Sequence, residues 1–75
     1  MTVDEAAALL AEMYRQGKAK KEASTYVHLF AIEYADQLDG ISLAELTERA
    51  GISPNYRTEL HKGIKLAQYV QLKPS

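Results

Sequence analysis

The side chains best suited to recognition chemistry lie close together between residues 55 and 65. On a helix, Arg57, His61 and Lys65 would align at successive i, i+4 positions on one side. Arginine and asparagine form paired hydrogen bonds with guanine and adenine, whereas lysine neutralises phosphate. The predicted roles are base contact for Asn55, Arg57 and Thr58, phosphate contact for Lys62 and Lys65, and either contact for His61.

The same row of cations has a simpler interpretation. Basic residues near the end of a short helix are often only solvated, because the helix dipole favours positive charge there. The net charge of −1 argues against a general nucleic-acid binder, although the chain from Pro54 onward carries four bases against Glu59 alone. Double-stranded DNA and a protein partner therefore both remain open at this stage.

Other chemistries find less support in the sequence. There is no cysteine, and the two histidines, His28 and His61, lie on different predicted helices, so we expect no metal and no cofactor. We expect His28 to have a structural role beside the core. The chain has no glycine-rich phosphate loop and no nucleophile motif. We therefore expect neither enzymatic activity nor a small-molecule substrate.

Length and composition predict a single domain over residues 1–75. Hydrophobic residues make up 47% and charged residues 25%, which is typical of globular proteins. The longest apolar run, "AAALLA", is too short to cross a bilayer. A cytoplasmic protein without a membrane partner is the expectation.

Two helices are predicted in the first half of the chain. Thr2 and Glu5 have capping-box spacing at the start of a helix over residues 3–16, and Gly17 is its predicted stop. The segment "GKAKKEAS" then reads as a solvated connector. A second helix over about residues 24–38 is apolar on two sides, with Leu29 and Ile32 outside its main stripe. Either this helix is central to the bundle, or Leu29 and Ile32 form a homodimer interface.

The second half predicts two helices joined by a tight turn. Ser42 and Glu45 predict a second capping box, and Gly51 is the expected left-handed residue that ends this helix. Ser53 and Pro54 begin the next helix, which extends to about residue 67 with Gly63 as a close-packing point. The tail "YVQLK" alternates like a strand. The predicted fold is an all-α, compact four-helix bundle, with a short C-terminal strand as a further option.

One stretch of the chain resembles a known motif. "ISLAELTERAGISPNYRTELHKG", residues 41–63, is similar to the bacterial helix-turn-helix, in which a first helix, a glycine turn and a Ser or Thr cap precede the recognition helix. It departs from the pattern at Thr47, usually a small residue, and at Arg57, usually a branched apolar one, whose inward role Tyr56 takes. With "YVHLFAIEYADQL", the chain also resembles small "HTH-like domain" proteins. The resemblance implies a DNA-binding transcriptional regulator or accessory factor.

Overall fold

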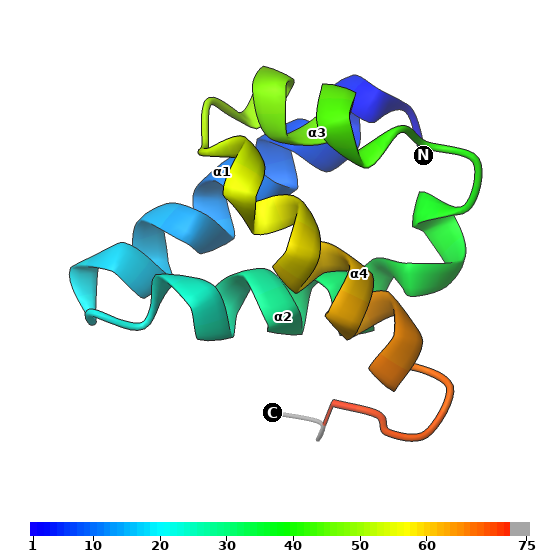
Figure 1. The fold of residues 1–75 in the computed structure, drawn as a ribbon. Coiled ribbons are helices and arrows are strands. Elements are labelled where there is room, and N and C mark those ends of the chain that lie inside the picture. The colour runs from blue at the N-terminus through cyan, green and yellow to red at the C-terminus, as the bar shows by residue number, and fades with distance from the viewer. Residues whose placement is uncertain (73–75) are drawn as a thin grey trace.

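The computed structural model describes residues 1–72, and helices are the only regular secondary structure in that range (Figure 1). Four α-helices are joined by short turns, two of which contain a single turn of 3-10 helix. The elements are α1 (Val3–Ala19), α2 (Ala23–Tyr34), the 3-10 turn η1 (Ala35–Leu38), α3 (Leu43–Ala50), the 3-10 turn η2 (Pro54–Tyr56) and α4 (Arg57–Leu66).

The first helix begins as predicted but ends later. Thr2 N donates to Glu5 Oε1 at 2.8 Å and Glu5 N donates to Thr2 Oγ1 at 3.1 Å, which completes the capping box. The predicted stop at Gly17 is wrong, because this glycine lies buried inside α1. A Cβ atom at Gly17 would lie 2.7 Å from Tyr26 Cβ, so the missing side chain lets α2 approach. Gly17 is therefore a packing residue.

Helix α2 is central to the bundle. It packs against both α1 and α4, whereas α3 packs mainly on α1. In Figure 1, α4 crosses in front of α2, and α3 lies across α1 on the other side of the molecule. The predicted helix over residues 24–38 is thus α2 followed by η1. The main apolar stripe of α2, with Val27, Phe30 and Ala31, is buried, whereas Leu29 and Ile32 on its second apolar side are only half-buried.

The core is drawn from all four α-helices, η1 and the turn after α3. Thr47 is the one buried polar side chain within residues 1–72, and its hydroxyl donates to Leu43 O at 3.2 Å and Ala44 O at 3.0 Å. Its polar atom is thus satisfied inside α3, which explains how threonine replaces a smaller residue here. The buried apolar side chains are Ala6, Ala7, Leu10, Val27, Phe30, Ala31, Leu38, Leu46, Ile52 and Leu60.

The C-terminal strand that the alternating tail predicted does not form in the part of it that the structure describes. Residues 69–72 contain no strand, and residue 73 lies outside the described range. Tyr69 N and Val70 N both donate to Leu66 O, so the chain turns directly after α4. Within residues 1–72, no helix is long and apolar enough to span a membrane.

Candidate nucleic-acid interface

A tight turn joins α3 to the segment that carries the predicted contacts. Gly51 has φ of 74°. Gly51 N donates to Glu48 O at 3.1 Å, and Ile52 N donates to Thr47 O at 3.1 Å. These two bonds form a Schellman motif, which satisfies the last carbonyls of α3. Ile52 is buried with Leu46 in the core, as its predicted fold back towards that residue requires. The predicted reversal of the chain at residues 51–53 is confirmed.

The caps beside this turn agree with the prediction in all but one bond. Ser42 Oγ accepts from Glu45 N at 3.3 Å, but the Glu45 carboxylate pairs with Arg49 at 2.8 Å. The second capping box therefore forms only its Ser42 half. Ser53 Oγ accepts from Asn55 N at 3.2 Å, and Pro54 opens η2. The helix predicted from residue 54 thus starts with one 3-10 turn before α4.

Tyr56 fixes the beginning of α4 against α1. Its ring meets that of Tyr14 edge to face, with centroids 5.4 Å apart and planes inclined by 76°. Burial raises the pKa of Tyr56, the Tyr14 hydroxyl raises it further, and the Ser24 hydroxyl acts in the opposite direction. Tyr56 therefore lies beside both α1 and the start of α2. This contact confirms the inward role predicted for Tyr56 and leaves Arg57 exposed.

The middle of α4 packs directly on α2. Gly63 is buried, and a Cβ atom there would overlap Ala31 Cβ and lie 2.9 Å from His28 O. One turn earlier, Glu59 Oε2 lies 2.5 Å from His28 Nε2, and both side chains are half-buried. The predicted close-packing role of Gly63 is confirmed, and His28 contributes to the α2–α4 contact as a structural residue.

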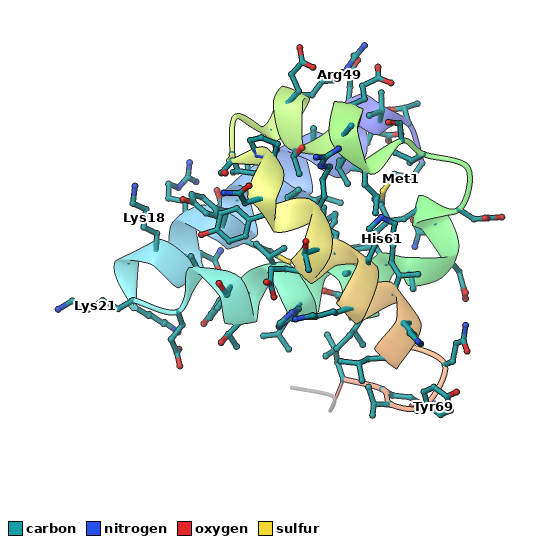
Figure 2. All side chains as sticks on the ribbon, in the orientation of Figure 1. Met1, Lys18, Lys21, Arg49, His61 and Tyr69 are labelled. Carbon is teal, nitrogen blue, oxygen red and sulfur yellow. The ribbon has the colours of Figure 1, made fainter. Side chains whose placement is uncertain are left out.

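The structure places the six predicted contact residues on the exposed side of η2 and α4. Lys62 and Lys65 line one surface hollow with Leu66 and Tyr69, whereas His61 lies at the edge facing η1 (Figure 2). Arg57 Nε donates to Pro54 O at 3.1 Å, which orients its guanidinium group. Exposed positions are occupied by Asn55, Arg57, Thr58, His61, Lys62 and Lys65.

Charge on this side of α4 is of one sign. Glu59 is the only acidic residue of α4, and it is turned towards His28. Within residues 1–72, the ion pairs that form do not include Arg57, Lys62 or Lys65. The exposed side of α4 therefore presents three cations that no carboxylate neutralises at close range.

Comparison with known proteins shows the family of this chain. A family model described as an HTH-like domain matches residues 2–73. The chain belongs to the HTH-like domain family. Comparisons with curated proteins and with solved structures each returned no match.

Two groups of apolar side chains in this HTH-like domain lie outside the core. Leu29 and Ile32, the predicted interface residues, are half-buried, and neither is among the side chains packed on the core. Large apolar side chains are also exposed at the end of α4 and in the tail: Leu66 by 45%, Tyr69 by 77% and Val70 by 45%. The sequence did not predict this second group.

Proposed function

We propose that this HTH-like domain binds double-stranded DNA by placing α4 in the major groove. The observation that carries the proposal is the unneutralised basic side of α4, held outward by Tyr56, Leu60 and Gly63 on its inner side. Ten residues of α-helix measure about 15 Å, and a major groove about 12 Å wide accepts a helix of this kind. A role in transcriptional regulation, or as an accessory factor, follows from such binding.

The order of side chains along α4 supports this docking. Asn55, Arg57 and Thr58 stand at its N-terminal end, where recognition helices contact base edges. The bond from Arg57 Nε to Pro54 O leaves Nη1 and Nη2 for a guanine. Lys62 and Lys65 lie one to two turns later, and they neutralise phosphates in the proposed complex.

A single copy of the domain offers few cations to DNA. The two phosphate contacts of α4, from Lys62 and Lys65, give a log–log dependence of affinity on salt of about −1.8, which is shallow. We therefore propose that the binding unit is a homodimer, with the half-buried Leu29 and Ile32 at its interface. Sedimentation at two concentrations, with Leu29→Ser/Ile32→Ser for comparison, tests this: the expected result is a concentration-dependent dimer that the double variant loses.

The test of DNA binding is a titration with mixed-sequence duplex DNA at low salt. Arg57→Ala/Lys65→Ala should weaken binding, because it removes two of the three unneutralised cations of α4, and loss of the Lys65 phosphate contact should reduce the magnitude of the log–log salt slope by about 0.9. The matched control is Lys20→Gln/Arg49→Gln, which also removes two positive charges. Lys20 contacts Tyr26 and Arg49 pairs with Asp4 and Glu45, so these cations are engaged within the protein.

Two results contradict the DNA proposal. The first is a wild-type protein that binds no duplex at low salt. The second is an α4 double variant that binds as tightly as the control double variant, because affinity would then reflect net charge alone. Thermal unfolding of each variant shows whether lost binding reflects lost folding.

The exposed apolar residues at the end of α4 and in the tail favour a second function, which is binding of a protein partner. Leu66, Tyr69 and the stems of Lys62 and Lys65 line a surface hollow of about 310 Å³. Exposed apolar surface with a charged rim is typical of protein interfaces. If the partner is a second copy of this chain, Leu66→Ser/Tyr69→Ser weakens the self-association seen in sedimentation and leaves DNA binding unchanged.

A further inference from the structure

The turn between α1 and α2 holds a lysine in an unusual backbone conformation. Lys21 has φ of 60°, and its amide donates to Lys18 O at 3.1 Å, while Glu22 N donates to Gly17 O at 2.7 Å. This is a second Schellman motif, with lysine at the left-handed position that usually holds glycine. The conformation directs the chain so that Lys18 and Lys21 stand at the same end of the molecule (Figure 2).

The three lysines of this turn differ in what they contact. Lys20 Nζ donates to Tyr26 Oη at 2.9 Å and lies 5.5 Å from the centre of the Tyr26 ring. Lys18 and Lys21 instead line a surface hollow of about 430 Å³, together with Glu22, Ala23, Ser24 and Thr25. Within residues 1–72, no ion pair includes Lys18 or Lys21. These two cations therefore face solvent around one hollow.

The hollow lies next to the N-terminal end of the proposed recognition helix. Tyr14 of α1 contacts Tyr56, and Lys18 follows Tyr14 by four residues, which is about one helical turn on the same side of α1. The edge-to-face contact of Tyr14 with Tyr56 thus places this end of α1 near η2, where Asn55 and Arg57 begin the exposed side of α4.

We infer that Lys18 and Lys21 bind backbone phosphates of the DNA strand that borders the groove occupied by α4. This inference rests on the DNA binding proposed above. The phosphates on either side of a major groove about 12 Å wide lie close to a docked helix, within reach of a neighbouring element. The hydroxyls of Ser24 and Thr25 add donors of the kind that contact phosphate oxygens.

Glu22 lines the same hollow and opposes an incoming phosphate. Replacing Glu22 should therefore change the DNA affinity in the opposite direction to replacing a lysine. Glu22→Gln should tighten DNA binding, because it removes a negative charge from the phosphate site and leaves both lysines in place. A weaker or unchanged affinity in this variant would contradict the inference.

The main experiment compares salt dependences of binding to mixed-sequence duplex DNA. Lys18→Gln and Lys21→Gln should each reduce the magnitude of the log–log slope by about 0.9, the value for one lost phosphate contact. Lys20→Gln is the matched control in the same turn, because it removes the same charge from a side chain engaged with Tyr26. Its slope should stay at the wild-type value. Far-ultraviolet circular dichroism confirms that each variant is folded.

The outcomes separate this inference from the function on which it rests. If Arg57→Ala/Lys65→Ala weakens binding but Lys18→Gln and Lys21→Gln behave like Lys20→Gln, the phosphate site is wrong and the docking of α4 stands. If the wild-type protein binds no duplex, both are wrong. If the log–log slope is reduced in the Lys18 and Lys21 variants but not in the Lys20→Gln control, the proposed phosphate site is supported.

Discussion

Gly63 of α4 lies against Ala31 of α2 so closely that a Cβ atom at Gly63 would overlap that of Ala31. The same added atom would lie 2.9 Å from His28 O, which is backbone and cannot easily move. The crossing of α4 over α2 therefore depends on a missing side chain. Because α2 and α4 share an extensive contact, this crossing fixes how the proposed DNA-binding side is presented.

Gly63→Ala should destabilise the protein, although alanine is the better helix former by roughly 1 kcal/mol. Overpacking a tight contact costs about 1–3 kcal/mol, and we expect this cost to exceed the gain in propensity. Urea unfolding measures the change. Thr58→Ala, at an exposed position of α4, is the control and should be neutral or slightly stabilising. If the Gly63→Ala protein were more stable than wild type, α2 and α4 would be able to move apart and accept the extra methyl group without cost.

Tyr56→Ala should loosen the beginning of α4. It removes the edge-to-face contact with Tyr14, and we expect a loss of about 2 kcal/mol in the free energy of unfolding. Tyr56→Phe keeps the ring and its contact with Tyr14, so it should cost clearly less than Tyr56→Ala. Equal stabilities of the two variants in urea unfolding would mean that the ring contact contributes nothing.

Lys21→Gly should stabilise the fold and weaken DNA binding. Glycine relieves a left-handed conformation that costs other residues roughly 1–2 kcal/mol, partly offset by the larger entropy of glycine in the unfolded chain. The expected net gain is about 0.5–1 kcal/mol in chemical unfolding. Gly51→Ala, at φ of 74°, tests the same physics in reverse and should lose stability. If Lys21→Gly binds DNA as wild type does, the phosphate role of Lys21 is wrong.

Glu5 should make stability depend on pH in the acid range. The hydrogen bond from Thr2 N, followed by that with the Thr2 side chain, lowers the pKa of Glu5 from its ordinary value of 4.5. A lowered pKa contributes stability that is present above 4.5 and lost as the pH falls through the folded-state value. In Glu5→Gln this contribution is absent at every pH. The difference in unfolding midpoint between the two proteins should therefore shrink on acidification, and a constant difference would contradict the assignment.

Gly17 and Gly63, the two glycines inside helices, show that helix ends cannot always be predicted from local propensity. Gly17 and Gly63 each break an apolar helical pattern, and the sequence predicted a stop at the first and a packing point at the second. Both are packing points, because a neighbouring helix lies where a Cβ atom would be. Local propensity contains no information about that neighbour, so the end of α1 was misplaced whereas the extent of α4 was predicted correctly.

Features that depend on near neighbours in the chain could be predicted from the residues alone. These are the Thr2 and Ser42 caps, the left-handed Gly51 and the 3.6-residue period that turns Arg57 outward, since each is set by hydrogen bonds or spacing within one turn. Only the tertiary structure brought Tyr14 of α1 against Tyr56, just before α4. Such contacts join residues about forty positions apart in the chain, and they form because separate helices bury a common core, which no local pattern specifies.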